Sequence, residues 1–491
     1  MRMVYLCCLL IIGALATGTH AQTLRSDVPR AWNDHEVAGF ELPLVNPERS
    51  PRYLSAAEYY SLEVMPIYRG YPVYLPGREP AGYMKSLQQT EPEIAFDPAK
   101  LRTERDWVEA GGIVFRAPRL YVPAGQSLNI GAIDSLHTPA TPDGILPFFQ
   151  YVVRTKGVVE LGITACAMCH TRVLPDGRVC EGAQGNFPWA RRDALLRIKQ
   201  QGPDSDQRAL RIEQPMYAAP WVERPDQLYA STAAEQIRRL EAAQPGVIAR
   251  EGASSAFPVH VPSLIGIKDI RYLDATGLTR HRSIADLMRY AIVNQGVIGS
   301  SGSGLQVTAH YGDFQPSNSK QQRYSDEQLY ALALYLYSLK PPVNPNPSDD
   351  EVARHGKRVF EDAGCAGCHT PPLYTNNKLT PAQGFQVPKS LSDTEQNLNV
   401  SVGTDPSLAM RTRRGTGFYK VPSLRGVWYR NAFGHMGQAE TLEEWFDPAR
   451  LGADYVPRGF HLEPGPIKGH EFGLNLSQAD RRALIAFLRT L

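Results

Sequence analysis

The chain has 491 residues, which at about 150 residues per domain predicts two or three domains. Hydrophobic residues make up 43% of it and charged residues 21%, values that exclude wholesale disorder and fibrous repeats. A net charge of +2 provides no basic excess for neutralising phosphates, so we expect no nucleic-acid partner.

The first elements are those of an export signal. Arg2 precedes an apolar run from Val4 to Ala16, and Thr19-His-Ala21 forms a small-x-small cleavage site. The run is shorter than the roughly 18–20 residues that a membrane span needs, so we expect no membrane span. A buried N-terminal helix is the alternative. We interpret residues 1–21 as a signal peptide, which places the mature protein in the periplasm or outside the cell.

Residues 22–155 form an N-terminal region rich in Pro, Tyr and Gly. We expect an irregular region with a few short strands, using apolar stretches such as Gly112–Phe115 and Pro147–Val153, and a helical turn at Asp106–Ala110. It packs on the domain that follows. There it either shapes a substrate entrance or only covers an edge of that domain.

Two C-x-x-C-H motifs follow, Cys166-Ala-Met-Cys169-His170 and Cys365-Ala-Gly-Cys368-His369. Chance alone would give about 0.002 such motifs in a chain of this composition. Cysteines three apart lie on one side of a helical turn, where they form thioethers with one porphyrin, and the next residue, His, reaches the iron. A zinc site or a redox-active cysteine pair is the alternative for a bare C-x-x-C. The duplication predicts two covalently bound haem c groups, with His170 and His369 as iron ligands.

The chain around the motifs repeats. Val261–Leu264 and Val421–Leu424 are both Val-Pro-Ser-Leu, and helix starts follow at Ser283–Leu287 and Thr441–Trp445. Ser325 and Ser477 then cap amphipathic terminal helices. Each unit resembles a cytochrome c domain. We therefore predict a mainly α fold with two tandem cytochrome c-type domains, at 156–340 and 351–491. A proline-rich linker at 341–350 joins them, and a helix over Asp349–Phe360 leads to the second motif.

The second unit also carries segments that resemble the bacterial di-haem cytochrome c peroxidase superfamily. That superfamily includes the methylamine-dehydrogenase-maturation enzyme and the di-haem rubber oxygenases. The resemblance covers 156–491 and rests on Phe418–Gly426, Ala432–Gly437 and Thr441–Glu444; Trp445–Leu451 and Gly469–Gly473 are most similar to the rubber-oxygenase branch. It implies that the N-terminal haem is the reaction centre and that the C-terminal haem passes electrons.

A reactive haem keeps one axial face open. The better-known peroxidases place a displaceable His soon after the first motif, whereas Thr171–Ala190 contains none and the next histidine is His260. Met216 and Met288 are alternative ligands, although a methionine commonly fills a core. We expect an open first haem.

Two residues between the motifs are candidates for the surroundings of the first haem. Phe257 is a candidate distal-pocket residue, as a Phe is in rubber oxygenases, or else a core residue. His260 occupies the position of Lys420 in the repeat, which favours a propionate or surface role over iron ligation.

For the second haem the candidate distal ligands are Met436, His461 and His470. We choose His470, because it lies in a Gly-flanked turn that can approach a haem face closely, and keep His461 as the alternative. His435 occupies a position where the superfamily has a propionate or pocket contact, and Ala449 stands where its peroxidases have an axial Met. Two imidazoles would lower the haem potential, which weakens the usual peroxidase scheme.

Three further residues attract attention. Trp221 and Trp428 are candidate stepping stones for electrons between the haems, or core residues. Cys180 lies near Asp176-Gly177, in an expected loop, as a free thiol or as part of an intermolecular bridge.

These observations predict an exported di-haem c-type oxidoreductase that activates hydrogen peroxide at an open N-terminal haem. The expected partner is a small periplasmic electron-transfer protein, either a c-type cytochrome or a cupredoxin. One alternative is a di-haem oxygenase or oxidase that uses dioxygen or peroxide on an organic substrate. A non-enzymatic two-haem electron carrier is the other, and an open coordination position favours an enzyme over it.

Overall fold

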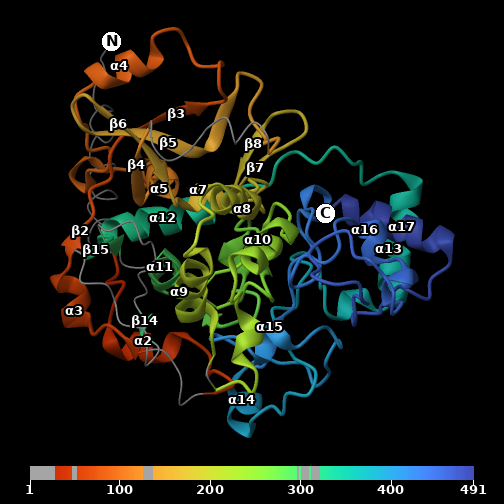
Figure 1. Cartoon of the computed structure of the whole chain (residues 1–491). Coiled ribbons are helices and arrows are strands. Elements are labelled where there is room, and N and C mark those ends of the chain that lie inside the picture. The colour runs from red at the N-terminus through yellow and green to blue at the C-terminus, as the bar shows by residue number, and fades with distance from the viewer. Residues whose placement is uncertain are drawn as a thin grey trace, which may run out of the picture.

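A computed structural model describes residues 28–46, 52–124, 136–219, 221–250, 252–295 and 321–491, with short strands at 298–299 and 309–310. The expected signal peptide at 1–21 lies outside the described residues. The described chain is predominantly helical with small sheets, as expected (Figure 1). Within it, no helix combines the length and apolar character that crossing a membrane requires.

Two crossed helix pairs organise the molecule. Helix α5 (Glu104–Arg116) crosses α12 (Asp326–Ser338) in one unit, and α13 (Glu351–Asp362) crosses α17 (Gln478–Arg489) in the other. The two pairs lie on opposite sides of the molecule (Figure 1). Each pair closes the hydrophobic core of its own unit.

Both crossings use the same close approach. A Cβ on Gly111 of α5 would collide with the carbonyl group of Ala331 in α12, and a Cβ on Gly356 of α13 would collide with that of Ala483 in α17. Only glycine lets the two backbones meet at this distance. The repeat seen in the sequence therefore continues into the packing of the helices.

The cap signals explain where these helices begin. Ser325 and Ser477 accept hydrogen bonds from the backbone N–H groups of Gln328 and Asp480, as expected for N-caps. Asp350 caps α13 in the same way, through the N–H of Ala353. The proline-rich segment before α13 has neither helix nor strand.

The N-terminal region is more regular than expected. Instead of a helical turn at 106–110 and a strand-like stretch at 112–115, one 13-residue helix, α5, covers both, with Thr103 as its N-cap. The helix contains Gly111 and Gly112, and because glycine is a poor helix former, the sequence did not indicate a continuous helix here. A domain boundary at residue 155 would separate α5 from its partner α12.

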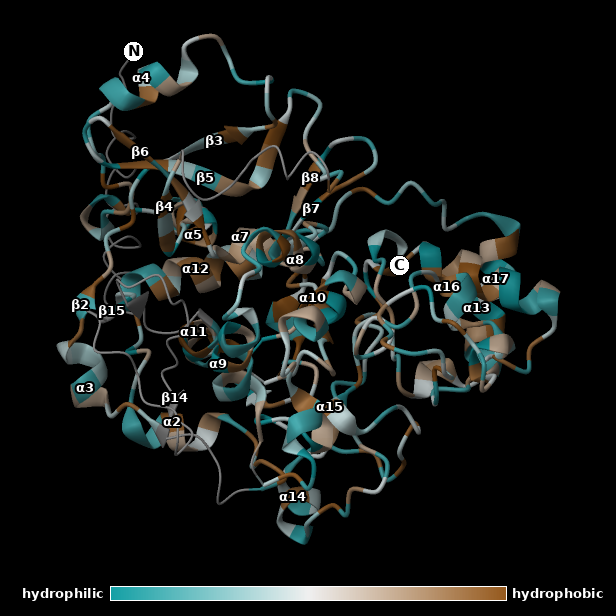
Figure 2. Cartoon of the chain, viewed as in Figure 1, coloured by the Kyte–Doolittle hydropathy of each residue, from teal (hydrophilic) through white to brown (hydrophobic). Residues whose placement is uncertain are grey.

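A four-stranded antiparallel sheet takes one strand from before α5 and three from the segment between α5 and the first cysteine motif. Its strand order is β3-β5-β6-β4, with β3 at Gly70–Tyr74, β5 at Ile145–Thr155, β6 at Val158–Ile163 and β4 at Leu120–Pro123. Hydrophobic residues run along β5 and β6 (brown in Figure 2) and form a separate core cluster. The expected apolar strand at 147–153 is the centre of β5.

The remaining helices connect these parts. They are α2 (Asp34–Phe40), α3 (Ala56–Ser61), α4 (Tyr83–Gln89), α7 (Cys166–His170), α8 (Trp189–Lys199), α9 (Ser205–Tyr217), α10 (Ala233–Ala242), α11 (Ile284–Gln295), α14 (Lys389–Thr394), α15 (Ser407–Met410) and α16 (Leu442–Trp445). The helices expected to start near Ser283 and Thr441 are α11 and α16, and the second ends after one turn.

Short antiparallel strand pairs tie the loops together. They are β1 (Arg52–Tyr53) with β14 (Ala309–His310), β7 (Thr171–Val173) with β8 (Val179–Glu181), β9 (Val247–Ile248) with β10 (Val259–His260), β11 (Tyr272–Leu273) with β12 (Thr279–Arg280), and β16 (Leu379–Pro381) with β17 (Phe418–Lys420). Strand β15 (Gln321–Arg323) joins β13 (Ile298–Gly299) antiparallel and β2 (Glu63–Val64) parallel.

Candidate functional site

The first cysteine motif forms the one-turn helix α7, directly after the four-stranded sheet. Ala167 packs in the core between α5 and α12, while Met168 packs in the core under the sheet. These two anchors fix the turn from opposite sides. Cys166 and Cys169 are free thiols, and with His170 they line one side of a cavity.

His170 is oriented by the repeated Val-Pro-Ser-Leu segment. Its Nδ1 lies 3.1 Å from the carbonyl oxygen of Pro262, so Nδ1 carries the proton and donates it. Nε2 then keeps its lone pair, which is the form that binds a metal. Burial lowers the pKa of His170 to about 4, so the ring is neutral near pH 7.

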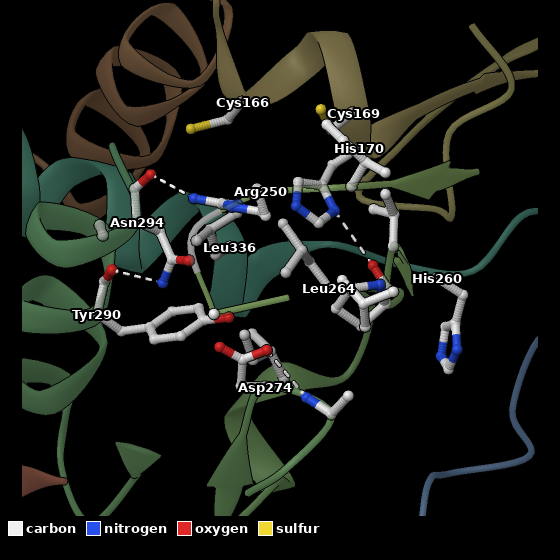
Figure 3. Close-up of a pocket in the computed structure, with 18 of the residues that line it drawn as sticks. Cys166, Cys169, His170, Arg250, His260, Leu264, Asp274, Tyr290, Asn294 and Leu336 are labelled. Atoms are coloured by element: carbon white, nitrogen blue, oxygen red, sulfur yellow. Dashed lines mark hydrogen bonds between the residues drawn. The ribbon is translucent and has the colours of Figure 1, made fainter. Parts of the chain in front are cut away.

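The cavity in front of His170 has several polar groups in its lining: Arg250 lies beside His170, and Tyr290, Asn294 and Asp274 lie farther from it (Figure 3). It encloses about 980 Å³, including the part open to solvent. Arg250 donates to the carbonyl oxygen of Asn294 at 2.5 Å, and the Asn294 amide donates to the carbonyl oxygen of Tyr290 at 2.9 Å. Asp274 lies below them, with its carboxylate facing the cavity in Figure 3. Leu264 and Leu336 supply part of the apolar wall.

The described lining of this cavity contains no methionine and one histidine besides His170, namely His260. The His260 Nδ1 lies 2.9 Å from the carbonyl oxygen of Gly434, which is part of the other unit. Met288 is fully buried in the core on α11, and Met216 lies half-buried on α9. Neither methionine lines the cavity.

Phe257 is also absent from the described lining. It packs against a cluster that contains Val247, Met436 and Phe460, with the Arg411 guanidinium 5.4 Å from its ring centre. The distal role that we expected for Phe257 remains a prediction without a contact to the cavity.

The second cysteine motif has the same local design. Cys365 and Cys368 are free and half-buried around a short 3₁₀ turn (Cys365–Gly367). The His369 Nδ1 lies 3.1 Å from the carbonyl oxygen of Tyr374, and the carbonyl of Pro422, the counterpart of Pro262, also bonds to this ring. The same tautomer follows, with Nε2 available as a ligand.

The repeated segments hold the two motifs in matching ways. Leu264 N–H donates to the carbonyl of Gly182, and Leu424 N–H donates to that of Tyr374. Gly266 and Gly426 then adopt positive φ angles, 79° and 73°, and open equivalent 3₁₀ turns. Val-Pro-Ser-Leu is therefore the segment that supports each histidine.

A second imidazole faces His369. The ring centres of His369 and His470 are 6.3 Å apart, with 56° between their planes. Metal bonds to imidazole nitrogen are about 2.0–2.1 Å long, so two axial imidazoles on one ion place their ring centres about 6.3 Å apart. Nδ1 of His470 is buried and has no hydrogen-bond partner, and burial lowers the pKa of this ring to about 4. The pair fits the two axial positions of one haem.

The other candidates for this position lie elsewhere. The Nδ1 of His461 lies 2.9 Å from the carbonyl oxygen of Gly459. Met436 is buried in the cluster with Phe460. The His435 ring stacks on Tyr419 with 3.5 Å between ring centres, and its Nε2 lies 2.7 Å from the hydroxyl of Thr404.

The donor groups of the chain fit haem better than zinc. Among the described residues, no group of three or more His, Cys, Asp or Glu side chains converges to hold a metal ion. A structural zinc site needs four protein ligands. In a haem c the porphyrin supplies four nitrogens, so the protein has to supply only the axial ligands and the cysteines that form the thioethers. His369 with His470, and His170 alone, meet the second requirement.

The two units exchange equivalent contacts where they meet. His260 N–H donates to the carbonyl of His435 at 3.0 Å, and Lys420 N–H donates to the carbonyl of Ala275 at 3.1 Å. His260 and Lys420 occupy equivalent positions in the repeat, so the contact has approximate two-fold symmetry. Burial lowers the pKa of His260 to about 4 and that of Lys420 to about 8. Neither sequence alternative for His260 anticipated this interface role.

Sequence reasoning missed the polar groups of the cavity, among them Arg250, Asp274 and Tyr290. The repeat carried a signal for Asp274. Its φ of 70° matches the 79° of Gly434, and Gly277 matches Gly437 at 65° and 69°. An aspartate therefore holds a backbone conformation for which the other unit uses glycine, and such strain is concentrated at functional positions.

Three residues noted in the sequence lie away from the cavity. Trp428 packs beside Tyr429 and against the cluster containing Cys180, between the two units, and Trp221 is half-buried in a turn after α9. Cys180 is not in a loop, as we expected, but on strand β8. Burial raises the pKa of its thiol to about 11, so it stays protonated.

Comparison with known proteins adds little. No protein-family model matches the sequence, and no curated protein matches it. Among solved structures, a chain of Kuenenia stuttgartiensis hydrazine synthase, pressurised with 20 bar xenon, is similar over 61% of this chain and 92% of that chain. Its sequence identity is 13% and its TM-score 0.30, a likeness too slight to support a conclusion about fold or function.

Proposed function

We propose that this chain is an exported di-haem c-type oxidoreductase with two cytochrome c-type units. In this proposal, hydrogen peroxide reacts at the N-terminal haem, and the C-terminal haem delivers electrons. One observation supports these different roles for the two haems. His369 faces a second imidazole at 6.3 Å, whereas His170 faces a cavity. A closed site suits electron transfer, and an open one suits chemistry on a bound oxidant.

The residues that would hold the two groups come from both units. Cys166 and Cys169 would attach the first haem and Cys365 and Cys368 the second. His170 would bind the iron of the first haem, and His369 with His470 would bind that of the second. When bound, the haems supply the redox-active iron that exchanges electrons with the oxidant.

The cavity residues would bind and orient the oxidant. Arg250, beside His170, carries a guanidinium that would stabilise a developing anion through hydrogen bonds. Burial raises the pKa of the Tyr290 hydroxyl well above its usual range, so it stays protonated and can donate a hydrogen bond. Asp274 presents a carboxylate that can accept or return a proton. Reduction of one peroxide to two waters consumes two electrons and two protons.

The electrons would come from a small periplasmic protein, a c-type cytochrome or a cupredoxin. The signal-like segment at 1–21 supports an exported location, where such carriers work.

The alternative activity is that of an oxygenase or oxidase using dioxygen or peroxide on an organic substrate. The His369–His470 pair favours it, because two imidazoles give a lower potential than His/Met ligation, and a lower potential makes the second haem a poorer acceptor from a small cytochrome.

A turnover assay separates the two activities. We expect reduced small cytochrome c to be oxidised when peroxide is added to the di-haem protein, with two cytochromes consumed per peroxide. Asp274→Asn should slow this reaction by about 10²–10⁴-fold if the carboxylate moves a proton. A stable dioxygen adduct of the reduced protein with negligible peroxide turnover would select the oxygenase instead.

A further inference from the structure

Arg450 is a large charged side chain at the centre of the second unit, and it is 0% exposed. It lies on the 3₁₀ turn Pro448–Leu451, just after α16. A buried guanidinium is costly unless its N–H groups are hydrogen-bonded. The partners of Arg450 therefore indicate what this part of the fold is built to hold.

The Arg450 side chain donates four hydrogen bonds to backbone carbonyl oxygens. Nε donates to Trp445 at 2.8 Å, and one terminal nitrogen donates to both Gly469 and His470 at 2.9 Å. The other terminal nitrogen donates to Ile467. In return, the Ile467 N–H donates to the carbonyl oxygen of Arg450 at 2.8 Å. Arg450 thus binds three carbonyls of the turn that presents His470.

The backbone of this turn adopts an unfavourable conformation that has to be stabilised by its neighbours. Gly469 and His470 have successive positive φ values of 74° and 45°, and a histidine pays a steric cost in that region. His470 N–H also donates to the carbonyl of Val402 at 2.7 Å, and Gly469 packs against Thr404 too closely for any Cβ. The turn is therefore fixed by contacts both to Arg450 and to the 402–404 segment.

The ring of His470 is held by the same group of residues. The Arg450 guanidinium lies 4.7 Å from the ring centre of Trp445, and the Trp445 ring lies 5.6 Å from that of His470. Arg450 therefore sets both the backbone below the imidazole and the indole beside it.

We propose that Arg450 is the positioning residue that holds His470 opposite His369, so that His470 stays bound as the second axial ligand. This inference rests on the proposed function, in which both histidines ligate the C-terminal haem. Lysine cannot replace Arg450, because a single ammonium group lacks the planar fork that reaches carbonyls in several directions.

The test uses the holoprotein with Arg450→Lys and Arg450→Ala, and reads the spin state of each haem by electron paramagnetic resonance. We expect both variants to lose most of the low-spin signal of the second haem and to gain a high-spin signal, while the first haem is unchanged. Added imidazole should restore the low-spin signal, because the variants lose the placement of a ligand and not the haem.

The matched control is Arg481→Lys. Arg481 also donates to backbone carbonyls in this unit, those of Leu474 and Leu476, but not to the His470 turn. We expect it to keep the wild-type signals. If Arg481→Lys loses the low-spin signal as Arg450→Lys does, the effect is not specific and the inference is overturned.

His470→Ala separates failure of the inference from failure of the proposed function. A high-spin His470→Ala beside a wild-type-like Arg450→Lys overturns the positioning role and leaves the ligand assignment intact. A His470→Ala variant that stays low-spin overturns the ligand assignment itself. If Arg450→Ala does not fold, the spectrum of Arg450→Lys alone tests the positioning role. If Arg450→Lys also changes the signal of the first haem, Arg450 supports the whole chain, and the inference is overturned.

Discussion

The two cysteine-pair turns share their local design but differ in what faces the histidine. His369 meets the imidazole of His470 at 6.3 Å, whereas His170 meets a cavity with Arg250 beside it and Asp274 farther across. In both turns a backbone carbonyl fixes the tautomer of the histidine. The motif therefore sets the proximal side, and segments remote in sequence decide whether the site is closed or open.

The largest effect is expected when one pair of cysteines is removed at a time. If each pair anchors its own haem, as we propose, replacing Cys166 and Cys169 by Ser should leave one covalent haem, and so should replacing Cys365 and Cys368. Haem content per chain after denaturation measures the effect. Haem that acid-acetone extracts from the wild-type protein would contradict covalent attachment.

The next test opens the closed site. In the proposed arrangement, His470→Ala should convert the second haem from low-spin to high-spin, because it removes one of the two imidazoles that would bind the iron. His461→Ala is the control, since His461 bonds to Gly459 and should leave the spectrum unchanged. If His461→Ala and not His470→Ala produced the change, the ligand choice would be wrong while the closed site remained.

A third test concerns the helix crossings that the two units share. Gly111→Ala and Gly356→Ala should each destabilise the chain by about 1–3 kcal/mol, because the added Cβ collides with backbone across the crossing. Gly39→Ala is the control: it also lies in a helix, but nothing is within 4 Å of an added Cβ. Denaturant unfolding measures all three variants. Gain of stability at Gly111 or Gly356 would show that the backbones are not in contact there.

The smallest expected effect is at the caps of the terminal helices. Ser325→Ala and Ser477→Ala should each cost about 1 kcal/mol, because each leaves a helix N–H without its side-chain acceptor. Ser325 should cost more, because it also forms a capping box with Gln328. Thermal unfolding of the two variants compares them, and equal shifts would remove the distinction between the caps.

Local signals in the sequence predicted part of this structure. Ser325 and Ser477 correctly predicted where the terminal helices begin. The expected strand at 147–153 is part of β5. The repeated Val-Pro-Ser-Leu segment marked equivalent supports for both histidines. These features depend on neighbours in sequence, which a sequence displays directly.

The rest depends on contacts between distant segments. Helix α5 is the counterpart of α13, but three strands, β4, β5 and β6, separate it from the first cysteine motif in the sequence, so its role as partner of α12 was hidden. Arg250 and Tyr290 come from different loops and helices and meet only in the folded cavity. Phe257, chosen by resemblance, packs in another cluster.

Electron paramagnetic resonance of the as-isolated ferric protein, with a cyanide titration, tests the central claim most directly. If one site is open and the other closed, one haem should be high-spin or water-ligated and the other low-spin. Cyanide should bind the first without prior reduction, because no protein ligand has to be displaced. Two low-spin haems that ignore cyanide in either redox state would contradict the account and favour an electron carrier.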